Sequence, residues 1–314
     1  MATRTESVTT ATVRRAIEGN KVSLVDLGLS TVLLLSLLTS LAVLLTLLID
    51  VLGQGWPVLS TRLGGLVSEP LSAEPTRAGL SQGLFGSLVL VGFVIVISFP
   101  LGVGAAIYLE EYARDTRFNR LLVTNIRNLA GVPSIVYGLL GLAVFVKVLG
   151  DVTNGRTLVS GGLTLAVLVL PIMVITASEA LRAVPIALRE ASFGVGATRW
   201  ETIRHHVLPV ALPGILTGSV LTMARAFGES APLLLAGAVL SNFFAAPAGA
   251  SLGSMITEQS YTALPIIIYN WARQPQQDFV ALTAAGIVVL LAMLLLVNAA
   301  AIVVRDRIER RRRL

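Results

Sequence analysis

The sequence has no cysteine, only two histidines and few charged residues, which make up 13% of its 314 positions. Without cysteine, the chain can form neither a disulfide framework nor a thiolate metal site. The two histidines, His205 and His206, are adjacent and lack the spaced companions that a metal site needs. No nucleotide-binding loop of the form G-x-x-x-x-G-K-[ST] occurs, and no Ser/His/Asp or paired-carboxylate constellation is present. We therefore expect this chain to bind no metal or cofactor and to have no catalytic role.

Hydrophobic residues are plentiful and make up 54% of the chain. The charged fraction lies well below the roughly 25% that is typical of a soluble domain. The apolar residues gather in uncharged runs, which can cross about 30 Å of hydrocarbon as helices. The sequence therefore predicts an all-α polytopic membrane protein with six transmembrane helices, at residues 27–49, 78–109, 129–146, 157–178, 207–240 and 279–304. The first run could instead be a signal peptide, but it is longer than the roughly 7–15 apolar residues of such a segment. We therefore expect an uncleaved first span.

Proline, glycine and aromatic residues mark the connections. Three prolines in the polar segment 53–77 predict that no helix continues through it. Pro100, followed by two glycines, predicts a kink in the second apolar segment. The short apolar stretch 264–268 cannot cross a membrane, and Tyr269 and Trp271 beside it would suit an interfacial anchor.

The distribution of positive charge predicts the orientation. If the N-terminus is cytoplasmic, the segments 1–27, 110–128, 179–206 and 305–314 are cytoplasmic and hold most of the 24 lysines and arginines. The opposite face then holds only Arg62, Arg77, Lys147, Arg156 and Arg273. The positive-inside rule therefore places both termini and the loop 179–207 in the cytoplasm. We expect a cytoplasmic N-terminal tail at 1–27, a six-span membrane domain at 28–304 and a basic cytoplasmic tail at 305–314, in a plasma or inner membrane.

Two charged residues fall within the fifth apolar segment. Arg225 and Glu229 are four residues apart and would share one helix face. Each charge costs about 2.5–3.5 kcal/mol at the centre of a span on insertion scales. One interpretation is a structural ion pair that fixes helix packing. The other is a translocation pathway in which Arg225 offers a positive charge to an anion and Glu229 holds or gates it. The acidic residues at the ends of other spans, Glu110, Glu111 and Glu179, are expected to lie at the interface.

The loop 179–207 mixes apolar and charged residues in the manner of an amphipathic helix that is broken at its glycines. It is too polar to cross a membrane and too apolar for a free linker. On physical grounds two interpretations remain open. The loop could lie in the headgroup layer, anchored by Trp200, or it could dock on a cytoplasmic partner.

The same loop carries a motif. Glu190, Ala191 and Ser192 are followed by Gly196, six residues after the glutamate, and by Leu208 and Pro209, twelve residues after that glycine. This pattern resembles the EAA signature of ABC importer permeases, with Ser192 in place of the second alanine and His206 where isoleucine is usual. The resemblance implies that the loop forms short helices that bind a cleft on an ATPase subunit and transmit its closure to the membrane helices.

The resemblance extends through most of residues 80–300. The segments YLEEYA (108–113), NLAGVPSIVYGLLGL (128–142), EALRAVP (179–185), ARAFGESAPLL (224–234) and ALPIIIYNWARQPQ (263–276) resemble the PstA-type permease family of phosphate importers. That family implies a type I ABC importer permease (MetI-like) fold and half of a translocation pathway completed by a PstC-type subunit. It also implies PstB-type ATPase subunits, which use ATP and Mg, and an extracytoplasmic phosphate-binding protein.

The alternatives within the same class are a PstC-type sister subunit or an ABC permease for another anion. From other classes, a secondary anion transporter would need no ATPase, and a membrane scaffold or phosphate-sensing component would transport nothing. The EAA loop disfavours the secondary transporter, and the charges within the fifth segment disfavour the scaffold.

Overall fold

The computed structural model describes residues 24–239 and 252–310, and every regular element within these ranges is a helix. The predicted all-α class is therefore confirmed for the described part of the chain. Most of the predicted N-terminal tail and the last four residues of the C-terminal tail lie outside the described residues. By its internal contacts the chain divides into two compact units, Met1–Val51 and Leu52–Leu314.

The first unit contains the beginning of helix α2 (Leu24–Ser68), whose apolar residues before Val51 are exposed along their whole length. Contrary to the prediction for 53–77, this helix does not stop at the prolines but continues to Ser68. Pro57 lies inside this helix, although proline removes one helical hydrogen bond. The helical dihedral angles are interrupted instead at Arg62 (φ −142°, ψ 19°). The polar connection therefore begins only after Ser68.

Within the described residues, five helical stretches are long and apolar enough to cross a membrane: Val25–Ser68, Ser81–Tyr112, Leu158–Arg182, Arg199–Gly228 and Asp278–Arg307. The predicted third span is different, because it consists of two helical stretches bent by 99°. Helix α5 (Arg117–Ala130) ends at Gly131, and helices α6 (Ser134–Gly141) and η3 (Leu142–Val148) follow after Pro133. Proline disfavours helical geometry in the residue before it, which explains the break. The described part of the chain thus has six spans only if this bent pair is one of them.

The second span is continuous but not uniform. It runs through α3 (Ser81–Phe93), η1 (Val94–Ser98), α4 (Phe99–Ile107) and η2 (Tyr108–Tyr112), of which η1 and η2 are π-helical turns. Pro100 stands at the start of α4, directly after η1, so the irregularity expected at this proline takes the form of a π-helical turn. The hydroxyl of Ser98 donates to the carbonyl of Ala166 and thereby joins η1 to the fourth span.

The fifth span ends earlier than predicted. Helix α11 (Leu208–Gly228) stops before Glu229, whose backbone is extended, and a short helix α12 (Ala231–Leu235) follows. The expectation of one helix over 207–240 is therefore wrong. Pro232 stands in the first turn of α12, where its missing N–H costs no helical hydrogen bond. Inside a continued α11 it would remove such a bond, so a new helix starts here instead. Glu229 belongs to the break and not to the helix.

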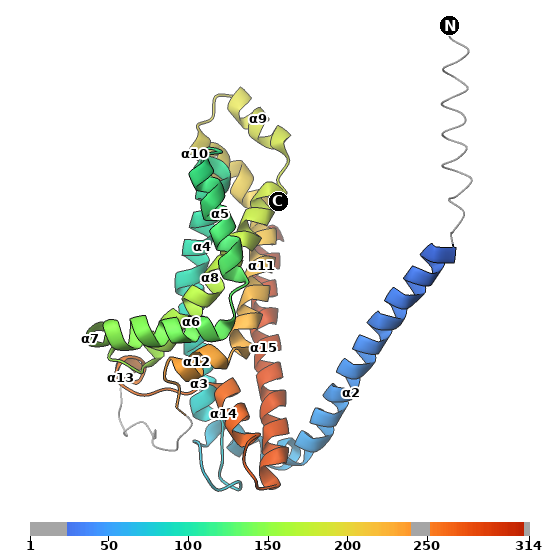
Figure 1. Cartoon of the computed structure of the whole chain (residues 1–314), viewed down its shortest axis with the longest axis vertical. Coiled ribbons are helices and arrows are strands. Elements are labelled where there is room, and N and C mark those ends of the chain that lie inside the picture. Colours follow the sequence, from blue (N-terminus) through green and yellow to red (C-terminus); the bar gives the residue numbers. More distant parts are fainter. Residues whose placement is uncertain (1–23, 240–251, 311–314) are drawn as a thin grey trace. The chain divides into compact units, whose positions relative to one another are not determined.

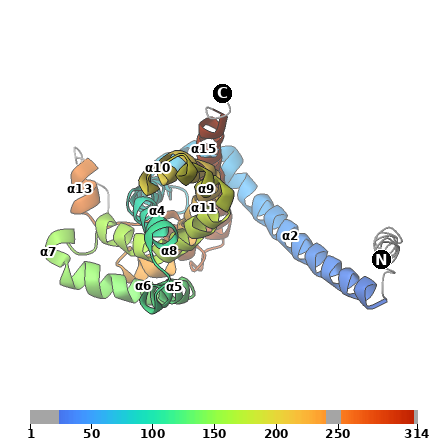
Figure 2. The same cartoon turned by 90° about the horizontal axis from the view of Figure 1, so that it is seen from above.

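Helix α8 (Leu158–Arg182) forms the centre of the second unit and packs against α3, α4, α5, α6 and α11. Small residues permit this close packing. A side chain on Gly102 would meet Met173 at 2.5 Å, so only glycine allows α4 to approach α8 so closely. Seen from the end of the unit, α6 and the following short helix α7 (Gly150–Thr153) extend sideways from these helices (Figure 2).

The segment that precedes the last span is part of the core. Helix α14 (Leu264–Trp271) buries its apolar residues, and Trp271, only 3% exposed, packs against Phe279 at a ring distance of 6.2 Å. The prediction of Trp271 as an interfacial anchor is therefore wrong, because its ring lies inside the protein. Tyr269 is exposed and has the guanidinium of Arg273 over its ring. The last helix is α15 (Asp278–Arg310), and the short helix α13 (Leu252–Thr257) precedes α14.

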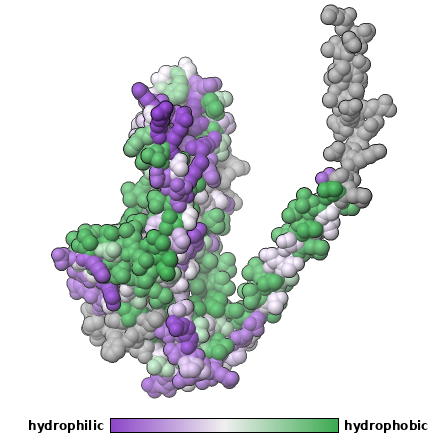
Figure 3. All heavy atoms as spheres, viewed as in Figure 1, coloured by the Kyte–Doolittle hydropathy of each residue, from purple (hydrophilic) through white to green (hydrophobic). Residues whose placement is uncertain are grey.

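The basic segments gather at one end of the Leu52–Leu314 unit. Figure 1 places the start of α5, the loop between α8 and α11, and the described end of α15 together at this end. Figure 3 shows hydrophilic residues concentrated there and a broad hydrophobic surface over the middle of the unit. Such a division suits a membrane protein with a polar end that projects from the bilayer.

Candidate functional site

The predicted loop folds into an ordered pair of short helices. After α8, Pro185 precedes helix α9 (Ile186–Gly194), and helix α10 (Arg199–Thr202) and the π-helical turn η4 (Ile203–Val207) lead into α11. Pro185 has already the φ angle that a helix start requires. The side chains of Thr198 and Glu201 form a reciprocal capping box at the start of α10. These local signals explain why the loop is helical.

Gly196 makes the turn between α9 and α10. Its φ of 85° lies in the region that L-residues avoid, and open space surrounds the position of a side chain. The requirement for glycine is therefore conformational and not steric.

Ser192, which departs from the EAA pattern, is buried under this turn. Its hydroxyl lies 2.9 Å from the hydroxyl of Thr202 on α10, within hydrogen-bonding distance. The serine therefore holds the two short helices together from inside.

Glu190 and Ala191 lie on the outer side of α9, where both are exposed. Large apolar side chains are exposed on the same two helices and the turn between them, although such groups are usually covered: Ile186, Phe193, Val195 and Trp200. We call the exposed surface of Ile186, Glu190, Phe193, Val195 and Trp200 the loop surface. Exposed aromatic side chains such as Phe193 and Trp200 are enriched at protein-binding surfaces.

The remaining motif residues join the loop to the fifth span. Leu208 packs against a core cluster formed by α4, α8 and α11, and Pro209 stands in the first turn of α11. Val207 and Ile215 are fully buried in the same region. The end of the loop is therefore anchored in the membrane part of the protein, so a movement of the loop would reach α11 directly.

Arg225 and Glu229 meet, as their spacing predicted, although not on one continuous helix. The Nε of Arg225 lies 3.5 Å from Oε1 of Glu229. Arg225 stands in the last turn of α11, where the helix dipole favours a positive charge. Its side chain is 53% exposed, whereas that of Glu229 is only 18% exposed. The arginine can therefore still approach a ligand while it is paired.

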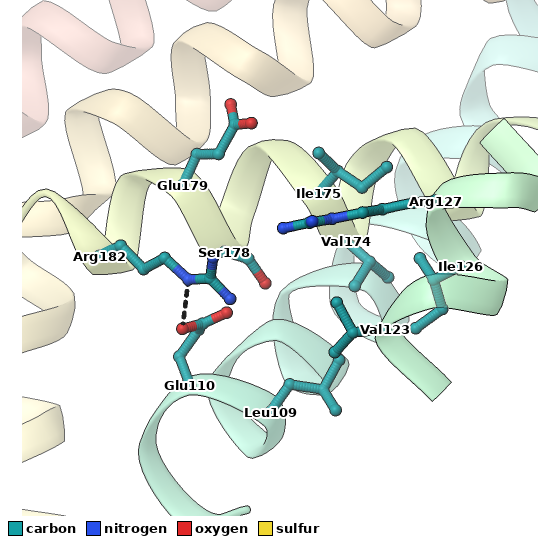
Figure 4. Close-up of a pocket in the computed structure, with 10 residues that line it drawn as sticks. All are labelled: Leu109, Glu110, Val123, Ile126, Arg127, Val174, Ile175, Ser178, Glu179 and Arg182. Atoms are coloured by element: carbon teal, nitrogen blue, oxygen red, sulfur yellow. Dashed lines mark hydrogen bonds and ion pairs between the residues drawn. The ribbon is translucent and has the colours of Figure 1, made fainter. Parts of the chain in front are cut away.

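The sequence interpretation missed a set of contacts at the end of the second span. Glu110 accepts a hydrogen bond of 2.7 Å from Nε of Arg182, and Glu111 forms an ion pair of 2.7 Å with Arg189 on α9. Beside the first pair lies a small cavity of ≈ 30 Å³, which Arg127, Ser178 and Glu179 also line (Figure 4). The signal was present, since two acidic residues end an apolar run in a chain whose loop is rich in arginine. The sequence did not show which arginine each carboxylate binds.

Within the described residues, no group of three or more histidine, aspartate or glutamate side chains is arranged to hold a metal ion. The described site consists of the exposed loop surface, ion pairs and helix ends.

Comparisons with known proteins identify a family and several similar chains. Residues 98–314 match the family of binding-protein-dependent transport system inner membrane components. The chain is 33% identical over 281 residues to the phosphate transport system permease protein PstA 1 of Mycobacterium tuberculosis strain H37Rv, and the match covers 89% of this chain and 87% of the relative. It is 39% identical over 163 residues to the probable ABC transporter permease protein YqgI of Bacillus subtilis strain 168. That second match covers 52% of this chain and 54% of the relative.

Among solved structures, the fold is similar to the MetNI methionine ABC transporter in an inward-facing conformation. The TM-score is 0.54 with 21% identity, and the similarity covers 73% of this chain and 94% of the other. At this identity the comparison supports the fold alone. The predicted MetI-like fold is confirmed, and the named relatives are permeases, not enzymes.

Proposed function

This chain belongs to the family of binding-protein-dependent transport system inner membrane components, and we propose that it is the transmembrane permease subunit of an ATP-driven importer of inorganic phosphate. The observation that carries the proposal is the loop surface, which exposes acidic and apolar side chains on the two short helices that connect α8 to α11. The similarity to a phosphate transport system permease over 89% of the chain supports phosphate as the substrate.

The loop surface binds an ATPase subunit of the PstB type. ATP and Mg belong to that subunit, which hydrolyses the nucleotide. Closure of two ATPase subunits moves α9 and α10, and α11 carries the movement into the membrane because the end of the loop is buried against the core. Glu190 contributes a negative charge to the contact, and Phe193 and Trp200 contribute apolar area.

The translocation pathway requires a second permease subunit, of the PstC type, and an extracytoplasmic phosphate-binding protein that delivers the substrate. Arg225 offers the anion a half-exposed positive charge next to the break between α11 and α12. Glu229 holds the guanidinium in place when no anion is present. A charge pair of this kind lowers the cost of keeping an arginine in an apolar environment.

The protein lies in the plasma or inner membrane, with both termini and the loop in the cytoplasm. Support comes from the basic segments 110–128, 179–206 and 305–310, which gather at one end of the unit that contains them (Figure 1). The positive-inside rule assigns such an end to the cytoplasm.

The test is uptake of radiolabelled phosphate by vesicles that contain the reconstituted complex. The ATPase subunits face the vesicle lumen, and ATP is enclosed there. Arg225→Gln should abolish uptake while the ATPase subunits remain bound, and Glu190→Ala should separate ATP hydrolysis from uptake. Normal uptake by Arg225→Gln would show that the Arg225–Glu229 pair has only a structural role. Uptake without any ATPase would identify a secondary transporter, and unlabelled sulfate that competes as well as phosphate would indicate another anion.

A further inference from the structure

Three consecutive residues at the end of the second span each contact a different arginine of the loop region. Glu110 binds Arg182 at the end of α8, Glu111 binds Arg189 on α9, and Tyr112 has the guanidinium of Arg199 on α10 over its ring at 5.8 Å. The three arginines come from three different helices. We call these six residues the η2 contact.

Arg189 is the best-satisfied member of the η2 contact. Its Nη2 donates to Oε1 of Glu111 at 2.7 Å and to the carbonyl of Leu181 at 3.0 Å, and its Nη1 donates to the carbonyl of Val184 at 2.8 Å. Leu181 lies in the last turn of α8 and Val184 just beyond its end, where backbone carbonyls are short of helical partners. The guanidinium therefore joins α9, the end of α8 and η2 at one point.

Burial gives the Glu111–Arg189 pair its strength. The side chain of Glu111 is 9% exposed and that of Arg189 is 20% exposed. Removing one partner would leave a nearly buried charge uncompensated, which is far more costly than the loss of a surface pair. The neighbouring pair is weaker, because the side chain of Arg182 is half exposed.

The π-helical geometry of η2 belongs to the same arrangement. The amide of Ala113 donates to the carbonyl of Tyr108 at 2.8 Å, a hydrogen bond to the fifth residue back. Such turns are rare inside α-helices and occur frequently at functional sites.

We propose that η2 receives the movement of the loop, so that α9 and the cytoplasmic end of the second span move as one body during transport. This inference rests on the proposed coupling to an ATPase. The covalent connections of the loop lead only to α8 and α11. The η2 contact adds a third route, to α4 and α3, through side chains 78 residues apart in the sequence. Arg189 and Glu111 are therefore positioning residues for coupling, and neither needs to touch phosphate or ATP.

The experiment measures phosphate taken up per ATP hydrolysed, in vesicles that contain the whole complex. Glu111→Gln and Arg189→Gln should each lower this ratio about tenfold or more, because each leaves a buried charge without its partner. Arg189→Lys should also fail to restore it, since an ammonium group lacks the planar fork that reaches three acceptors. The double charge exchange Glu111→Arg with Arg189→Glu should recover part of the ratio.

Arg120→Gln is the matched control. Arg120 lies near the same end of the second unit but pairs with Asp115 on the exposed surface. This variant should keep the wild-type ratio, since surface pairs contribute little.

The absence of native cysteine allows a second measurement. The variant Glu111→Cys with Arg189→Cys should lose coupling when reduced, and a short bifunctional thiol reagent should restore it by replacing the ion pair with a covalent link. Restored coupling supports the proposal. If the link blocks transport instead, the two elements move relative to each other and the proposal is wrong.

Two further outcomes would contradict the proposal. The first is a wild-type ratio in Glu111→Gln. The second is loss of the ATPase subunits from the purified Glu111→Gln complex, because the pair would then shape the docking surface without transmitting movement. If wild-type vesicles show no ATP-dependent phosphate uptake at all, the proposed function fails, and this result is distinct from both.

Discussion

The hydroxyl of Ser192 lies 2.9 Å from that of Thr202, across the turn that joins the two short helices of the loop. Thr202 also donates to the carbonyl of Thr198 at 3.0 Å, so it has a second partner. An interior hydrogen bond, a capping box and one glycine therefore shape the turn between α9 and α10.

We predict that Ser192→Ala destabilises the pairing of α9 and α10 by about 1 kcal/mol, the net value of an ordinary hydrogen bond. The loss is small because Thr202 keeps its bond to Thr198. Coupling should persist, since the resemblance to the EAA signature places alanine at this position. Hydrogen exchange of the α9 amides measures the local stability. A collapse of transport in Ser192→Ala would show that the serine has a role beyond packing.

Gly196→Ala should destabilise the turn by about 1–2 kcal/mol, because its φ of 85° is costly for any residue with a Cβ atom. Gly194→Ala is the matched control, since Gly194 has equally open surroundings and ends α9 without a positive φ. The control should be neutral or slightly stabilising. Faster amide exchange over α9 and α10 in Gly196→Ala alone is the expected result. Equal exchange in the two variants would show that the positive φ at position 196 does not require glycine.

Glu229→Gln should lower the KM for phosphate several-fold and lower the turnover as well. The carboxylate competes with the anion for Arg225, so its removal strengthens anion binding and slows release. Adding Glu229→Gln to Arg225→Gln should not restore uptake, because the carboxylate acts only through the arginine. Initial rates of uptake over a range of phosphate concentrations separate the two parameters. An unchanged KM would mean that Glu229 does not compete for the arginine, and Glu258→Gln, an exposed site, serves as the control.

Trp271→Ala should destabilise the Leu52–Leu314 unit by about 3–5 kcal/mol, as expected for loss of a large buried aromatic side chain. Tyr269→Ala, two residues away and exposed, should cost far less. Thermal unfolding of the purified complex measures both. If the two variants unfold at the same temperature, Trp271 is not part of the core that its contact with Phe279 indicates.

The Arg120–Asp115 pair gives one pH-dependent expectation. Hydrogen bonds from Arg120 hold the pKa of the Asp115 carboxyl below its ordinary value. The stabilisation is therefore present at neutral pH and is lost as the pH falls through the lowered pKa. Both side chains are largely exposed, so the effect on transport at neutral pH should be negligible.

Several features of the fold followed from the sequence because they depend on local chemistry. Uncharged runs predicted helices at α8 and α15, and the glycine at 196 predicted the turn of the loop. Family membership was equally accessible, because the EAA pattern lies within one segment of about twenty residues. The spacing of Arg225 and Glu229 also predicted their contact, although Glu229 proved to lie beyond the helix.

The errors occurred where neighbours outweigh local preference. The prolines of segment 53–77 predicted a break, but α2 continues to Ser68. Pro133 did not lead us to predict the 99° bend in the third apolar segment. The preference of tryptophan for membrane interfaces suggested an anchor at Trp271, but packing against α15 buries it.

By itself, the sequence determined the helical class, which connecting segments are basic, and which residues form the loop. Hydrophobicity, charge and backbone preference act over short distances, so these features can be read locally. Only the tertiary structure decided which charges meet. Glu111 and Arg189 are 78 residues apart, and no local rule pairs them. Their contact exists because α4 packs against α8 closely enough to bring the end of the second span beneath the loop.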